Sequence, residues 1–257
     1  MNPTRFGLVL LTAALLGLAP GAATRAAAQD HGNPGTFYRG SAYLWWANID
    51  GENQLGDLEL TVGDSTKLFA SFAGDFAFGK GRLRGVATFS TTSLSNQTEL
   101  TGTGIPDSTL VNYDFSQTMA ELFAWWQVGR FNTSQAFQLF GGLRYTHQKQ
   151  TLLDGPVPGS FTATWVEPVG GAQYFVEMGG FLWATITGDI GGVLFGSRFA
   201  YGVGGELGAH VYGPVHLALS YRFLQTNYNN DGDEDDSSYR WDEGTTQGWY
   251  MGIVIKG

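Results

Sequence analysis

Residues 199–223 alternate between two kinds of side chain with a period of two. Almost every odd-numbered position is apolar, whereas the even-numbered positions are mostly glycine, alanine, serine or charged. Successive side chains of an extended strand leave opposite faces, so this period predicts two β-strands. The break at Gly213-Pro214 predicts that they pair as an antiparallel hairpin. Its continuous apolar face must point either into the core of a soluble sandwich or into lipid around a membrane barrel.

The N-terminus reads as a secretory signal peptide. Arg5 precedes the uncharged apolar run 6–19, and the alanines at 26–28 fit a small-residue cleavage site before Gln29. The run is too short for a membrane span, so we expect residues 1–28 to be removed after export. Residues 29–257 are then long enough for one barrel or sandwich domain, and no cysteine is present to stabilise it by disulfides.

The charge balance argues against a nucleic-acid partner. Two of the 14 basic residues, Arg5 and Arg25, belong to the expected leader, which leaves 12 basic against 23 acidic residues. A protein that neutralises phosphates needs the opposite balance. Glycine is frequent (38 residues) and 8 tryptophans are present, a composition that suits a membrane barrel with bent strands and aromatic residues at the lipid–water interface.

Ten stretches of the chain have strand character, and the connections between them fall into two classes. Glycine-rich turns at 79–81, 129–135, 179–180 and 213–214 are short, whereas those at 51–71, 96–108, 150–160 and 227–238 are mostly longer. The short return at 191–197 is the exception in the long set. This asymmetry is typical of outer-membrane barrels and has no reason to occur in a soluble sandwich. We therefore expect a single antiparallel up-and-down transmembrane β-barrel, of ten strands with eight possible, in the cell outer membrane. The apolar parity changes near Gln117, where we expect a β-bulge.

Four segments carry a family resemblance. WVEPVGGAQY (165–174), GDIGG…GS (188–197), YRFLQTNY (221–228) and GWYMG (248–252) resemble a widespread group of Gram-negative outer-membrane β-barrel proteins, porin-like and mostly of undefined role. Gln173 stands where the group usually has an arginine that would pair with Glu167, and Gly257 replaces the usual terminal aromatic residue. The resemblance implies outer-membrane lipid, lipopolysaccharide and the barrel-assembly machinery as partners.

If the apolar parity faces lipid, the opposite parity lines a lumen. Opposite charges in so narrow an interior are expected to pair, because an isolated buried charge is very costly. We expect either a structural role, with these pairs bracing the barrel, or a narrow channel lined by the same groups. The lumen-lining candidates are Asp75, Arg84, Glu121, Arg144, Glu167, Asp189, Glu206 and Arg222, with His210 and His216 near the short turn.

No residue pattern predicts catalysis or a cofactor. His147 lies near the outer end of its strand, but no nucleophile–base or paired-carboxylate spacing accompanies it. We expect a protein without enzymatic activity, and keep an outer-rim enzyme acting on lipid or peptide as the alternative. The acidic loop supports a further alternative, a surface-binding protein, and could hold divalent cations at Asp231, Asp233 and Asp235, although it lacks the EF-hand spacing.

Overall fold

The computed structural model describes residues 36–55, 58–62, 71–102, 104–105, 109–132, 134–154, 159–192, 197–229 and 239–257. The expected leader 1–28 and the acidic residues 231–235 lie outside these ranges. Every regular element in the described residues is a β-strand, and none is a helix that could cross a membrane. The strands are β1 (Thr36–Leu55), β2 (Leu58–Val62), β3 (Ser71–Lys80), β4 (Leu83–Gly102), β5 (Thr109–Asn132), β6 (Gln135–Leu152), β7 (Gly159–Met178), β8 (Leu182–Gly191), β9 (Ser197–Tyr212), β10 (Val215–Asn229) and β11 (Tyr239–Lys256).

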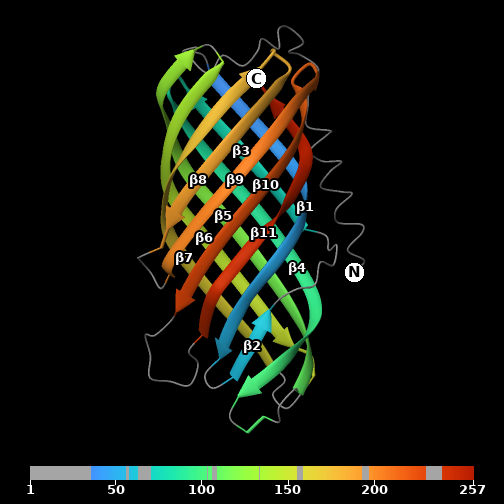
Figure 1. Ribbon diagram of the computed structural model, residues 1–257. Coiled ribbons are helices and arrows are strands. Elements are labelled where there is room, and N and C mark those ends of the chain that lie inside the picture. Colours follow the sequence, from blue (N-terminus) through green and yellow to red (C-terminus); the bar gives the residue numbers. More distant parts are fainter. Residues whose placement is uncertain are drawn as a thin grey trace.

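The strands pair into one closed antiparallel sheet. Strands β3 to β11 pair with their sequence neighbours, and β1 closes the ring by pairing with β3 on one side and β11 on the other. Ten strands form this ring, while the short β2 lies between β1 and β4 at one end only (Figure 1). The expectation of an all-β, antiparallel, up-and-down sheet is confirmed. Closure leaves β1 and β11 without a free edge over most of their length, which protects against edge-to-edge aggregation.

The two ends of the ring differ. The turns at 81–82, 179–181 and 213–214 gather at one end, called here the short-turn end, where the Tyr38 and Gly257 backbones also bond to each other. At the other end, the long-connection end, strands β4, β5, β6 and β7 run well past β3 and β8. The expectation of a loop over 51–71 is wrong at 58–62, where β2 pairs with both neighbours, and β4 continues to Gly102 into the expected loop 96–108.

The outward side chains of β4–β7 change character in a single step. Cross-strand pairing aligns them in rows, and successive outward rows lie two residues apart, about 7 Å along the strands. One row is apolar throughout: Phe89, Ala120, Tyr145 and Val166. The next row toward the long-connection end is polar throughout: Thr91, Thr118, His147 and Thr164. The outer surface therefore has a sharp boundary between an apolar belt and a polar end.

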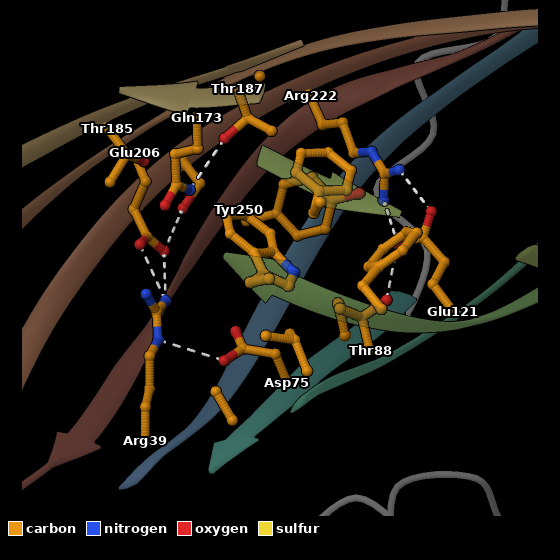
Figure 2. A pocket seen from close by; sticks show the side chains of 18 of the residues that line it. Arg39, Asp75, Thr88, Glu121, Gln173, Thr185, Thr187, Glu206, Arg222 and Tyr250 are labelled. Atoms are coloured by element: carbon orange, nitrogen blue, oxygen red, sulfur yellow. Dashed lines mark hydrogen bonds and ion pairs between the residues drawn. The ribbon is translucent and has the colours of Figure 1, made fainter. Parts of the chain in front are cut away.

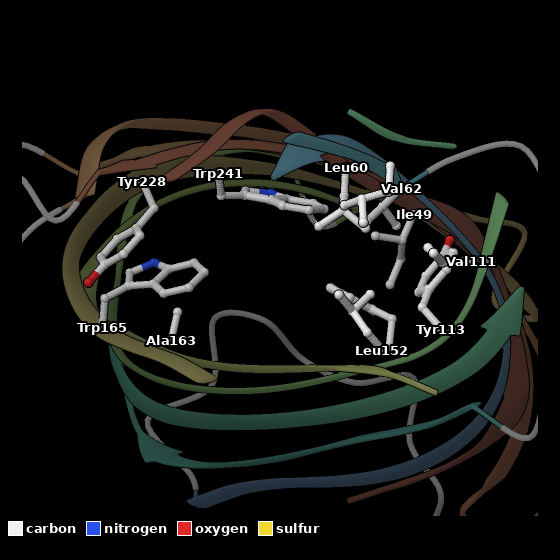
Figure 3. Close-up of a cluster of buried hydrophobic side chains, with 12 residues drawn as sticks. Ile49, Leu60, Val62, Val111, Tyr113, Leu152, Ala163, Trp165, Tyr228 and Trp241 are labelled. Carbon is white, nitrogen blue, oxygen red and sulfur yellow. The ribbon is translucent and has the colours of Figure 1, made fainter. Parts of the chain in front are cut away.

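The inner surface changes in the opposite sense. Around the middle of the ring it carries charged side chains, whereas beyond the boundary it carries the largest buried apolar cluster, in which Phe115 and Trp241 stack at 5.7 Å (Figure 3). Twelve buried side chains make up this cluster, called the outer core here: Ile49, Leu60, Val62, Leu100, Val111, Tyr113, Phe115, Leu152, Ala163, Trp165, Tyr228 and Trp241. The long-connection end is thus built like a water-soluble sheet protein, apolar inside and polar outside.

The expected bulge near Gln117 is wrong. The pairing of β5 with β6 runs without a register shift from Tyr113 to Gln127, and β5 side chains keep the same inward parity throughout. The apolar residues change parity there because the environment outside the strand changes, and the register shift comes later, between Gln127 and Gly129. Within the belt the apolar side chains of a strand point outward, and in the polar end they point inward. A strand that crosses from one region to the other therefore exchanges its apolar and polar faces without an inserted residue.

Candidate functional site

The structure places all eight predicted lumen residues on the inner face of the ring. Seven of them form two ion-pair networks, and the eighth, Arg84, holds its guanidinium over the ring of Phe37 at 4.2 Å. Each network combines side chains from strands that are distant in sequence. The seven are Asp75 and Glu206 in one network, and Glu121, Arg144, Glu167, Asp189 and Arg222 in the other.

Arg144 is the centre of the larger network, called here the Arg144 network. Its guanidinium is fully buried and contacts three carboxylates from three strands: Glu121 at 2.7 Å, Glu167 at 3.0 Å and Asp189 at 2.6 Å. Thr88, Glu121, Arg144 and Glu167 are direct cross-strand neighbours on β4–β7, so pairing alone aligns them. A guanidinium presents five N–H donors in a fixed fork, which suits it to several oxygens at once.

Arg222 reaches the same network from β10, on another side of the ring. Its two terminal nitrogens donate to both oxygens of Glu121, at 3.0 and 2.7 Å, and Thr88 donates a further hydrogen bond of 2.7 Å to that carboxylate (Figure 2). Asp189 lies 3.9 Å from Arg222. The Arg144 network therefore spans the interior from β4 to β10 and ties strands together that share no backbone hydrogen bonds.

The second network is organised by Arg39, which the sequence analysis missed. Arg39 lies 3.2 Å from Asp75 and 2.9 Å from Glu206, and Glu206 also accepts hydrogen bonds from Tyr43 at 2.6 Å and Ser220 at 3.0 Å. The signal was present, because Arg39 has the parity opposite to the outward Tyr38 in a recognisable strand. The Arg39 network joins β1, β3, β9 and β10 inside the half of the ring nearer the short turns.

A cavity of about 270 Å³ lies between the two networks (Figure 2). Phe123, Trp125 and Phe140 form one wall, with the rings of Trp125 and Phe140 stacked 4.5 Å apart. Tyr250 and the hydroxyl-bearing Thr187 contribute elsewhere to the lining. The cavity is large enough for several waters but is bounded by the Arg144 network on the side toward the outer core.

Position 173 holds glutamine where the group that the sequence resembles usually has arginine, yet both Gln173 and Glu167 have polar partners in the structure. The amide of Gln173 donates to Thr187 at 3.0 Å, while Glu167 is fully buried against Arg144. Arg144, placed directly across from Glu167 on β6, thus supplies a positive charge to that carboxylate.

The three histidines in the described part of the chain, His147, His210 and His216, lie apart from the networks. His210 and His216 pack together beside the 213–214 turn, with ring centroids 5.1 Å apart, and His210 bonds to the Gly213 carbonyl at 2.9 Å. His147 faces outward and bonds to Thr164 at 2.8 Å. Within the described ranges, no three histidine or carboxylate side chains gather in a way that could hold a metal ion.

One exposed carboxyl marks the long-connection end of β6. The backbone N–H of Asn112 donates to Asp154 at 2.6 Å, and the Asn112 side-chain amide bonds to the same carboxylate. These hydrogen bonds hold the pKa of Asp154 below its ordinary value, the backbone bond contributing most. This contact ties the end of β6 to β5.

No protein-family model and no curated protein matches the chain. Solved structures match in fold. The outer membrane protease OmpT from Escherichia coli aligns with a TM-score of 0.52 at 10% identity, over 88% of this chain and 98% of that one. The translocator domain of autotransporter NalP from Neisseria meningitidis gives 0.42 at 11% identity (98% and 95% covered), and OprG from Pseudomonas aeruginosa 0.40 at 12% (88% and 98%).

The OmpT likeness shows that the chain has a β-barrel fold, and at this identity it shows the fold alone. Nearly the whole length of both chains takes part in the alignment. What the ring does in this chain must be argued from its own surfaces and interior.

Proposed function

We propose that the chain is an outer-membrane β-barrel with a structural role and a closed interior, without enzymatic activity. The apolar belt supports the membrane location, because a soluble protein rarely exposes so large a continuous apolar surface. Leu122 is 64% exposed, Trp126 62%, Ile186 65% and Met251 51%, on three different strands. Aromatic side chains also mark both margins of the belt, as expected at lipid–water interfaces: Trp46, Phe89, Tyr145 and Trp249 at one, and Tyr38, Phe78, Tyr174 and Phe181 at the other.

The orientation follows from the connections. Outer-membrane barrels keep short turns in the periplasm and long connections outside, and an even number of strands brings both chain ends to the periplasm. The short-turn end of this ring, with Gly257, would then face the periplasm. The long-connection end, with the outer core and β2, would project from the cell surface.

The Arg144 network is the observation that best supports a closed interior. A conducting path needs a continuous column of water, but Arg144 is completely buried and Glu121, Glu167 and Asp189 are less than a tenth exposed. The outer core occupies the ring beyond this network. A barrel of about this strand number has an interior that side chains can nearly fill. The cavity of about 270 Å³ supports the second candidate, a narrow channel, in which it would be the periplasmic vestibule.

Single-channel recording in planar bilayers tests the proposal. We expect the refolded, heat-modifiable wild-type barrel to give no reproducible conductance steps. The double variant Glu121→Ala/Arg222→Ala, which removes the link across the interior, is expected to give small steps if it folds. Reproducible steps from the wild type would contradict the closed interior and support the narrow channel. A protein that remains water-soluble and shows no heat-modifiable mobility would contradict the membrane barrel itself.

A further inference from the structure

We propose that the cavity between the two networks is a binding pocket for a small, uncharged aromatic molecule that carries hydrogen-bonding substituents. This role goes beyond the structural role proposed above and does not depend on how the barrel is oriented in a membrane. The Arg144 network bounds the pocket toward the outer core, whereas the lining residues Phe37 and Arg84, beside the 81–82 turn, are partly exposed. A ligand therefore enters and leaves past Phe37 and Arg84, from the short-turn end.

Part of the pocket surface is aromatic. Trp125 and Phe140 stack with ring centroids 4.5 Å apart, and Phe123 meets Phe140 edge-on at 5.1 Å. Ala77 and Val86 extend this apolar surface along β3 and β4. A cavity water needs two to four polar partners, and these side chains offer it few, whereas a flat ring can stack on them. The volume of about 270 Å³ corresponds to about nine waters, enough for one substituted ring.

The pocket also contains polar side chains that no protein group satisfies. Four lining side chains are each less than a tenth exposed and have no hydrogen-bond partner within the described part of the chain: Ser90, Gln138, Thr185 and Tyr250. Gln138 is the inward residue next to Phe140 on β6, and Thr185 lies on β8 beside Glu206 (Figure 2). Buried polar groups are normally hydrogen-bonded, so this unused capacity points to a ligand whose edge carries donors and acceptors.

The charges of the lining favour an uncharged ligand. The lining contains four carboxylates, Asp75, Glu121, Asp189 and Glu206, and three guanidinium groups, those of Arg39, Arg84 and Arg222. All four carboxylates are paired with arginines of the Arg39 or Arg144 network. Arg39 and Arg222 belong to the same pairs, and Arg84 holds its guanidinium over the ring of Phe37. A charged ligand would have to compete with these pairs and lose its own hydration, a cost that an uncharged ligand avoids.

The test uses the full chain refolded in detergent micelles and three nearly isosteric probes at neutral pH. Benzamide is uncharged, benzoate is an anion and benzamidinium is a cation. The variant Gln138→Leu removes the unpaired amide and keeps the side-chain volume, so it should fold as wild type does. The matched control is Gln127→Leu, directly across from Gln138 on β5, likewise buried but outside the lining. Thr185→Val is a second variant of the same kind. The readouts are saturation-transfer NMR and the ligand-induced shift of the tryptophan indole signals, with protein-free micelles as the blank.

We expect benzamide to bind wild type and Gln127→Leu alike, with a Kd on the order of 0.1–1 mM for a ligand of this size. Gln138→Leu is expected to weaken binding roughly tenfold and Thr185→Val several-fold, the effect of one or two hydrogen bonds. Both charged probes are expected to bind roughly tenfold more weakly than benzamide.

Absence of saturable benzamide binding would show that the cavity holds water only and would overturn the proposal. Equal binding of benzamide by wild type and Gln138→Leu would also overturn it, because the ligand would then lie elsewhere. A charged probe that binds as tightly as benzamide would contradict the assignment of an uncharged ligand. Heat-modifiable mobility of each sample distinguishes a failure of the pocket from a failure of the proposed membrane barrel.

Discussion

Replacing Arg144 by methionine is expected to destabilise the barrel by about 3–5 kcal/mol, because the change leaves buried carboxylates without their central cation. Arg144 is fully buried and contacts Glu121, Glu167 and Asp189. Methionine fills a similar volume without the charge, so lost packing contributes little. Urea titration of the refolded protein in lipid vesicles, followed by heat-modifiable mobility or tryptophan fluorescence, measures the free energy of unfolding.

Arg240→Met is the matched control for this prediction. Arg240 also contacts a carboxylate, that of Asp242, but its side chain is 43% exposed. Exposed ion pairs contribute about 0–1 kcal/mol, so this variant should unfold close to wild type. Adding Glu167→Gln to Arg144→Met should recover part of the lost stability, because it removes one uncompensated charge. A loss of under 1 kcal/mol for Arg144→Met would show that the network does not brace the barrel.

Trp241→Ala is expected to cost about 3–5 kcal/mol through the cavity that it leaves in the outer core. Trp241 is 1% exposed and stacks on Phe115. The ring also lies against Gly51 and Gly244, where an added Cβ would overlap it, so neighbouring backbone closes tightly around it. The same urea titration measures the loss.

The variant Trp241→Phe separates the loss of packing from the other effects of the Trp241→Ala substitution. Phenylalanine retains much of the aromatic contact with Phe115, so most of the stability should return. Because the outer core lies beyond the apolar belt, the Trp241→Ala barrel should still insert and show heat-modifiable mobility. Unchanged stability of Trp241→Ala would contradict a folded apolar core at the long-connection end.

The eight predicted inward residues could be placed from the sequence because parity alone assigns the face of a strand. Their partners could not be predicted. Which carboxylates surround Arg144 depends on the stagger of β5–β8, and the approach of Arg222 depends on closure of the ring. Arg39 is not among the predicted inward residues, although its parity, opposite to that of the outward Tyr38, places it inside the ring.

The long-connection end was harder to predict for a different reason. An inverted apolar parity at Gln117 has two causes that a sequence does not distinguish, an inserted residue or a change in what lies outside the strand. The uninterrupted pairing of β5 with β6 shows the second. Strand β2 was missed because LELTV (58–62) is only five residues long within a polar segment, and it is held by pairing with β1 and β4.

A nitroxide scan along β6 tests the membrane boundary most directly. The chain contains no cysteine, so single cysteines at outward positions 139, 143, 145, 147, 149 and 151 can be labelled without removing native thiols. In vesicles, we predict high accessibility to oxygen and low accessibility to a water-soluble nickel reagent through Tyr145, with the order reversed from His147 onward. Uniform accessibility to the nickel reagent along the whole strand would contradict a lipid-facing belt, and with it the proposed outer-membrane barrel.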